Sequence, residues 1–205
     1  MKKILFISLL AALFTSCKEV EEPGKYDNWQ ARNQAYADSL QREAGNNFVA
    51  TEQQALNMST NTLFAIQDMS VSTDVAKRYV YCKKISENNP SGIRPLYTST
   101  VTLFYYGTFF TGEKFDGNFT GYSAAEHGTL DPQEKEKAPT PFDSPNTWAL
   151  TSLRPGMVAA MQYMRSGERW ILYLPFESGY GSTEYGSIPA YSALVFDVQI
   201  EEVIP

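Results

Sequence analysis

Short runs of β-branched and aromatic residues fill the second half of the chain and restrict its fold more than any other feature. Such runs are typical of strands, and they lie at 78–84, 100–110, 170–174 and 194–200. One helix is clear between the second and third of these, since Pro155 suits its first position and Gly167 ends it. Its apolar side is lined by Met157, Ala160, Met161 and Met164. Several antiparallel strands with a single apolar helix predict an α+β domain, an antiparallel sheet wrapped around one short α-helix.

The N-terminus is typical of an exported protein. Lys2 and Lys3 precede an apolar run, 4–14, with the length of a signal-peptide core. The run is too short to cross a bilayer, which takes roughly 20 apolar residues. It ends in Leu-Phe-Thr-Ser-Cys, residues 13–17, which resembles the lipobox of bacterial lipoproteins. We predict a signal peptide over 1–16 and lipidation of Cys17, with an ordinary secretory signal and a chance cysteine as the alternative. The anchor would hold the chain in a bacterial cell envelope, at the outer membrane, facing the periplasm or the outside.

Residues 17–25 are predicted to form a tether, because Pro23 and Gly24 follow a charged stretch. That stretch, Lys-Glu-Val-Glu-Glu at 18–22, resembles the signal that sends lipoproteins of the Bacteroidetes to the cell surface. A solvated, charged tether explains it equally well. With Cys17 lipidated, Cys82 is the one remaining cysteine, so no internal disulfide is expected. Cys82 lies in a predicted strand, where packing is expected rather than reactivity.

The segment 26–74 is predicted to be a helical extension. Trp29, Tyr36 and Leu40 fall on one face of a helix over 26–44, which Gly-Asn-Asn at 45–47 ends. The pattern over 62–69 fits either a short helix or a strand. This segment is too polar and too small to fold alone, so we expect it to pack on a main domain over 75–205.

The acidic balance of the chain excludes one class of partner. The formal net charge is −6, and loss of the first sixteen residues, which carry Lys2 and Lys3 and no acid, leaves −8. A chain of this charge lacks the basic surface that binds nucleic acid. It is also unsuited to binding an anionic membrane through its own surface charge. His127 is the one histidine, with no second histidine or paired cysteine, so no metal site is predicted.

Six motifs in the second half of the chain occur in a recognisable order. The first is the strand 101–108 with Thr-Gly-Glu-Lys-Phe-Asp at 111–116, the second is Pro-Phe at 141–142, and the third is Leu-Arg-Pro-Gly-Met at 153–157. The last three are the segment 164–170, the segment 175–181 that ends in Gly-Tyr-Gly, and the segment 188–198. In this order they resemble the FKBP-type peptidyl-prolyl isomerases. The resemblance covers the predicted main domain and implies the FKBP-like fold, the sheet wrapped around one short helix.

The resemblance implies rotation about the peptide bond that precedes proline in polypeptides. The barrier is about 18–20 kcal/mol, because amide resonance must be broken. Such a reaction requires no nucleophile and no cofactor. It requires an apolar, water-poor cup that favours the twisted amide, and a few donors that hold the peptide.

The resemblance also implies a set of site residues. The catalytic group would be Tyr105, Phe115, Asp116, Tyr180 and Phe196, and the substrate-binding group Phe142, Leu153, Arg154, Met157 and Ile188. Asp116 would orient the site by hydrogen bonding. The Tyr180 hydroxyl and the backbone N–H of Arg154 would each bind a substrate carbonyl. Alternation alone favours plain core for Phe115, Phe142 and Phe196, and only their place in the order of motifs assigns them to the pocket. Tyr185 could overhang the pocket or not.

Three departures from the family pattern bear on activity. Met157 stands where the family has a tryptophan floor, and methionine is apolar but flexible. Arg154 stands where an aliphatic residue is usual. Residues 117–140 form a long polar insertion that could cap the pocket or recruit unfolded clients. Two hypotheses follow: a lipid-anchored isomerase that assists the folding of exported proteins, or an FKBP-like lipoprotein that binds peptides or acts as a scaffold with little turnover.

Overall fold

The computed structural model describes residues 24–70, 77–131 and 133–205. The predicted signal peptide, Cys17 and most of the predicted tether lie outside these residues. Along the described ranges, no helix combines the length and the apolar character that a bilayer-spanning helix requires.

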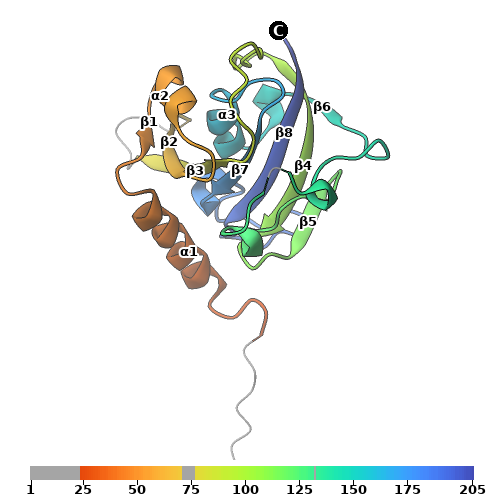
Figure 1. Cartoon of the computed structure of the whole chain (residues 1–205). Coiled ribbons are helices and arrows are strands. Elements are labelled where there is room, and N and C mark those ends of the chain that lie inside the picture. The colour runs from red at the N-terminus through yellow and green to blue at the C-terminus, as the bar shows by residue number, and fades with distance from the viewer. Residues whose placement is uncertain (1–23, 71–76, 132) are drawn as a thin grey trace, which may run out of the picture.

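Eight strands form one sheet in the order β1-β2-β3-β7-β8-β4-β5, with β6 also paired to β4 (Figure 1). Their bounds are β1 Phe48–Val49, β2 Leu63–Asp68, β3 Arg78–Lys84, β4 Thr100–Phe109, β5 Lys114–Gly117, β6 Asn146–Ala149, β7 Arg169–Leu174 and β8 Leu194–Ile204. Only the β1–β2 pair is parallel among these strands. Strand β4 is long enough to pair with β6 through its first half and with β5 through its second. The predicted α+β class is confirmed.

Helix α3, Pro155–Met161, packs on one face of the sheet. Its Met157, Ala160 and Met161 meet inward side chains of the central strands, among them Leu172 and Phe196. The helix is shorter than the sequence predicts, because the chain turns after Met161 instead of continuing to Gly167. Met164, after the turn, is still fully buried. The predicted apolar side is therefore intact although the helix is not.

The opposite face of the sheet is covered by helix α1, Trp29–Ala44, and by the insertion 117–140. Leu40 and Ala44 of α1 and Tyr122 of the insertion share a buried cluster with Tyr173 and other residues of this face. In Figure 1, α3 lies behind β8 and the insertion crosses in front of it. The central strands are thus buried on both faces, which explains their nearly continuous apolar runs.

The segment predicted as a helical extension also supplies two strands. Besides α1 and the short helix α2, Glu52–Asn57, it forms β1 and β2, and β2 pairs antiparallel with β3. The ambiguous stretch 62–69 is a strand because Leu63 and Ala65 pack on one face and Phe64 and Ile66 on the other. The predicted helical extension is therefore only partly helical, and the burial of β2 on both faces hides the period of two that would have identified this strand.

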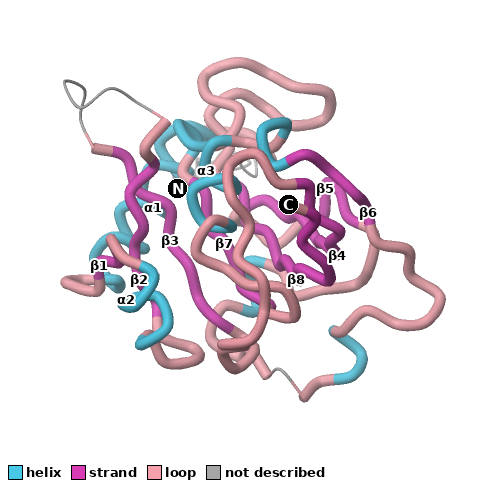
Figure 2. Tube along the Cα trace, turned by 90° about the horizontal axis from the view of Figure 1, so that it is seen from above, coloured by secondary structure: helices cyan, strands magenta, loops and turns pink. Residues whose placement is uncertain are grey.

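Figure 2 shows the loop between the short turn Lys135–Lys137 and β6 projecting from the β6 edge of the molecule. This loop carries Phe142, which is 97% exposed. The loop is closed by Asp143, whose carboxylate accepts hydrogen bonds from the Thr140 N–H and hydroxyl at 2.7 and 2.8 Å.

Candidate active site

A cavity of about 290 Å³ opens between the concave face of the sheet and the start of α3. Strands β4, β5, β6 and β8, the first turn of α3 and the loop before β8 all contribute to its lining. The lining residues are Tyr105, Phe115, Asp116, Trp148, Ser152, Leu153, Arg154, Met157, Tyr180, Tyr185 and Phe196. Eight of the ten predicted site residues are brought together here. The two exceptions are Ile188, which is buried in the core cluster behind the lining, and Phe142.

Two phenylalanines form the aromatic wall. The rings of Phe115 and Phe196 meet edge to face, with centroids 5.5 Å apart and an interplanar angle of 89°. Gly107 on β4 makes this possible, because a Cβ there would lie 2.8 Å from Phe115 Cζ and 3.0 Å from Phe196 Cε1. The glycine in the middle of a strand therefore marks the place where two rings lie directly on the backbone.

Met157 lies on the α3 side of the cavity and is 4% exposed. Helix α3 can approach the sheet closely at this end because the preceding residue is Gly156, where a Cβ would come within 2.7 Å of Leu174 Cγ. Among the described residues of the insertion, 117–131 and 133–140, none belongs to the cavity lining. The cavity is thus not capped by the insertion, which was one of its two expected roles.

Asp116 and Tyr105 form the polar side of the cavity. The Asp116 carboxylate accepts a hydrogen bond from the Gly117 N–H at 2.8 Å and lies within reach of the Tyr105 hydroxyl. Burial raises the pKa of Tyr105, and its interaction with Asp116 raises this pKa further. The Tyr105 hydroxyl therefore keeps its proton at neutral pH.

Tyr180 and Tyr185 stack at the mouth of the cavity, with ring centroids 4.5 Å apart and planes at 16°. Burial raises the pKa of Tyr180, so its hydroxyl is a hydrogen-bond donor at neutral pH. Tyr185 is 62% exposed and is held by a bridge in which its N–H and that of Ile188 each donate to the other residue's carbonyl at 2.9 Å. Of the two expectations for Tyr185, the structure places it at the cavity.

The backbone at Arg154 is positioned by the start of α3. Arg154 is the N-cap residue in an extended conformation, and its carbonyl accepts the N–H of Val158 at 3.0 Å. Its own N–H makes no hydrogen bond to another described residue. This N–H is therefore open to a ligand, as the N-terminal N–H groups of a helix commonly are.

Trp148 is the cavity aromatic that the sequence reasoning missed, and it occupies the role that Phe142 was expected to have. Its ring centroid lies 4.9 Å from that of Tyr105. Strand β6 brings it there, because Trp148 is paired with Val101 of β4. The signal was the alternating Asn-Thr-Trp-Ala directly before Leu150, a short strand pattern with one large aromatic. Assignment of Phe142 to the pocket was wrong, because that ring lies on the projecting loop.

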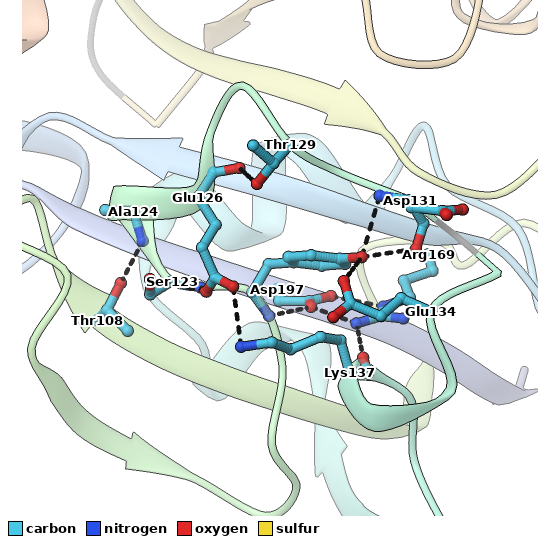
Figure 3. A network of polar contacts seen from close by, with 11 residues as sticks. Thr108, Ser123, Ala124, Glu126, Thr129, Asp131, Glu134, Lys137, Arg169 and Asp197 are labelled. Carbon is cyan, nitrogen blue, oxygen red and sulfur yellow. Dashed lines mark hydrogen bonds and ion pairs between the residues drawn. The ribbon is translucent and has the colours of Figure 1, made fainter.

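The insertion binds the far face of the sheet through a polar network centred on Asp197 (Figure 3). Asp197 is fully buried and pairs with Arg169 at 2.5 Å, and it accepts the Tyr122 N–H at 2.8 Å. The Ala124 N–H donates to the Thr108 hydroxyl at 3.0 Å and so joins the insertion to β4 as well. These hydrogen bonds therefore fix the insertion on the face of the sheet opposite α3.

Besides Lys83 of β3, whose Nζ lies 3.0 Å from its Nε2, His127 contacts two further elements. Its ring lies 2.5 Å from the Tyr173 hydroxyl through Nδ1 and 3.0 Å from the Glu43 carboxylate of α1 through Nε2. These contacts account for both ring nitrogens.

Comparison with known proteins agrees with this architecture. Residues 93–201 match the family model of FKBP-type peptidyl-prolyl cis-trans isomerase, which is more than half of the chain. The chain belongs to this family. Its resemblance to the family was therefore correctly identified from the motifs.

Individual relatives match the same part. The chain is 32% identical over 114 residues to FKBP-type peptidyl-prolyl cis-trans isomerase FkpA of Aeromonas hydrophila, covering 56% of this chain and 35% of the relative. It is 34% identical over 89 residues to the macrophage infectivity potentiator of Trypanosoma cruzi, covering 43% and 42%. It is 27% identical over 114 residues to the outer membrane protein MIP of Legionella longbeachae, covering 55% and 40%. The matched part spans less than half the length of each of these relatives.

The fold has a counterpart among solved structures. A peptidyl-prolyl cis-trans isomerase from Pseudomonas syringae pv. tomato superposes with a TM-score of 0.55 at 15% identity, covering 90% of this chain and 99% of that one. At this identity the comparison supports the fold alone.

Proposed function

We propose that this chain is a peptidyl-prolyl cis-trans isomerase acting on proline-containing polypeptides. The observation that carries the proposal is the open cavity in which Phe115, Phe196, Trp148 and Met157 surround a small set of hydrogen-bond donors. Membership of the FKBP-type family supports it. Nucleic acid is not a proposed partner, and no cofactor is required by the reaction.

The cavity suits a reaction that needs no covalent chemistry. The planar amide is charge-separated by resonance, and the twisted amide is less so, so an apolar, water-poor site favours the twisted form. The Tyr180 hydroxyl and the Arg154 N–H are placed at the mouth, where each could hold a carbonyl of the bound peptide. Asp116 would keep Tyr105 in place rather than transfer a proton. Catalysis would come from preferential binding of the rotated state.

The alternative is an FKBP-like module that binds peptides without turnover. Met157 favours this alternative, because its flexible side chain lies where the family has a rigid tryptophan floor. The open mouth of the cavity, clear of the insertion, favours the isomerase.

A prolyl isomerase assay on a short proline peptide separates the two candidates. We expect the wild-type chain to accelerate cis-to-trans exchange, which takes tens to hundreds of seconds uncatalysed. No acceleration at micromolar concentrations of folded protein would eliminate the isomerase and leave the binding module. Tyr180→Phe removes only the hydroxyl and is expected to lower kcat/KM about tenfold, or about 1.4 kcal/mol. Tyr191→Phe, at a tyrosine outside the cavity lining, is the matched control.

We propose further that Cys17 carries a lipid that holds the domain in a bacterial cell envelope, at the outer membrane, where it assists the folding of exported proteins. The support is the N-terminal signal pattern and the lipobox-like residues 13–17. One relative is named as an outer membrane protein. Mass spectrometry of the N-terminal peptide from the expressed full chain should show a diacylglyceryl-modified Cys17. Cys17→Ser should move the protein to the soluble fraction, whereas Cys82→Ala should leave it in the membrane fraction. A soluble wild-type protein would contradict the proposal.

A further inference from the structure

The Arg154 side chain lies at the mouth of the cavity. Arg154 and Asp116 are the two charged residues of the lining. The Arg154 guanidinium lies over the ring of Tyr180, with Cζ 4.8 Å from the ring centroid. This stacking places a partly buried positive charge beside the tyrosine hydroxyl that we assign to the bound peptide.

Asp116 does not neutralise this charge. Its carboxylate accepts the Gly117 N–H at 2.8 Å, and it lies with Tyr105 in the cavity lining. Among the ion pairs and side-chain hydrogen bonds of the described residues, none includes the Arg154 guanidinium. By contrast, Arg94, Arg165 and Arg169 each pair with a carboxylate. Arg154 thus offers its donors to the cavity, in a protein whose overall charge is −6.

A guanidinium of this kind recognises a carboxylate best. Its planar fork donates two parallel N–H bonds to the two oxygens of one acid, and such charge-assisted bonds are about twice as strong as neutral ones. The backbone N–H of the same residue is the proposed anchor for a peptide carbonyl. An acidic side chain one residue from the proline would therefore come within reach of the guanidinium while the proline occupies the aromatic wall.

We propose that Arg154 is a specificity-determining residue that selects polypeptides with Asp or Glu next to the proline. This inference rests on the proposed function, since it assigns the substrate class of the same cavity. The Arg154 side chain would determine which peptide binds. The backbone N–H of this residue is retained in every variant except a proline. Charge reversal at this position can therefore test the side chain alone.

The test uses short peptides that carry Glu, Gln or Lys next to proline, in one set before it and in another after it, in a protease-free isomerase assay. Wild-type kcat/KM should be about five- to tenfold higher for Glu than for Gln in at least one set. Arg154→Met should bring this ratio to about one, and Arg154→Glu should invert the order so that Lys is preferred. Arg42→Glu changes the net charge equally at an exposed position of α1 outside the lining and should keep the wild-type preference.

Two results would overturn the inference: equal kcat/KM for Glu and Gln in both sets, or a preference that survives Arg154→Glu. Raising the salt concentration should reduce the preference, because an ion pair at a cavity mouth is screened. Calorimetric affinities for the same peptides keep the two proposals apart. If the wild type isomerises no peptide, the proposed function fails. The role of Arg154 is still decided by the ratio of affinities for the Glu and Gln peptides, compared between the wild type and Arg154→Glu.

Discussion

Phe196 and Asp197 are neighbours in β8, and they serve opposite faces of the sheet: Phe196 lines the cavity, whereas Asp197 is buried under the insertion. Because side chains alternate across a strand, one short stretch of β8 joins the wall of the candidate site to the polar network that holds the insertion.

Removal of Asp197 should strongly destabilise the fold. Asp197→Ala leaves the Arg169 guanidinium, only 5% exposed, without its carboxylate. Loss of one partner of a buried ion pair costs about 3–5 kcal/mol, because the remaining charge stays desolvated. Urea denaturation should show this loss in the free energy of unfolding. Glu113→Gln, which removes the solvent-exposed pair with Lys25, is the control and should leave the free energy of unfolding nearly unchanged. The double variant Arg169→Met with Asp197→Leu should recover much of the stability, and a double variant as unstable as Asp197→Ala would contradict this account.

Gly107→Ala should damage the aromatic wall. The new Cβ would overlap Phe115 Cζ at 2.8 Å and press on Phe196, so a ring or the strand must move. Overpacking of this kind costs about 1–3 kcal/mol, and kcat/KM for a proline peptide should fall with it. Gly128→Ala is the control, because a Cβ added at Gly128 would meet nothing within 4 Å. Equal activity of both variants would show that the wall tolerates displacement.

Trp148→Ala should lower kcat/KM more than Phe142→Ala. Trp148 lines the cavity against Tyr105, whereas Phe142 is 97% exposed on the projecting loop. We expect a loss of about tenfold for the first, or about 1.4 kcal/mol, and a change within about twofold for the second. Peptide kinetics on both variants, with circular dichroism to confirm folding, make the comparison. A larger loss for Phe142→Ala would mean that the loop closes over bound substrate.

The rate of isomerisation should be flat between about pH 6 and pH 9. Burial raises the pKa of both Tyr105 and Tyr180 above the ordinary tyrosine value of about 10. Both hydroxyls therefore keep their protons across this range, and the reaction itself requires no proton transfer. A bell-shaped profile of kcat/KM against pH would contradict the proposed mechanism.

Buried tyrosine also has a consequence for stability. An unfolded chain ionises its tyrosines near pH 10, while the folded protein holds the protons more tightly, so unfolding becomes more favourable as the pH rises above about 10. Burial, followed by a hydrogen bond with Glu134, raises the pKa of Tyr122 to about 12. The urea midpoint should accordingly fall between about pH 10 and pH 12. Tyr122→Phe should reduce this fall, and an unchanged pH dependence would count against a tightly held proton.

Local pattern was sufficient for much of the fold. The strands at 78–84 and 100–110, the start of the helix at Pro155 and its apolar side are all readable from residue type and spacing, and the structure has them as β3, β4 and α3. Eight of the ten predicted site residues line one cavity because they belong to motifs whose order along the chain corresponds to their place in this fold. Where a strand is buried on both faces, as β2 is, the alternation of apolar and polar residues disappears. The sequence then does not distinguish a strand from a helix.

The sequence by itself determined the family, the strand-rich domain and most of the cavity lining, since these depend on short-range pattern and motif order. Only the tertiary structure decided which aromatic completes the wall. The order of the motifs indicated Phe142, whereas the pairing of β6 with β4 brings Trp148 to the cavity instead. The structure also decided that the insertion covers the face behind Asp197 and leaves the mouth open to Arg154 and Tyr180. Such choices depend on contacts between residues far apart in the chain, which a local pattern can suggest, as at Trp148, but cannot select.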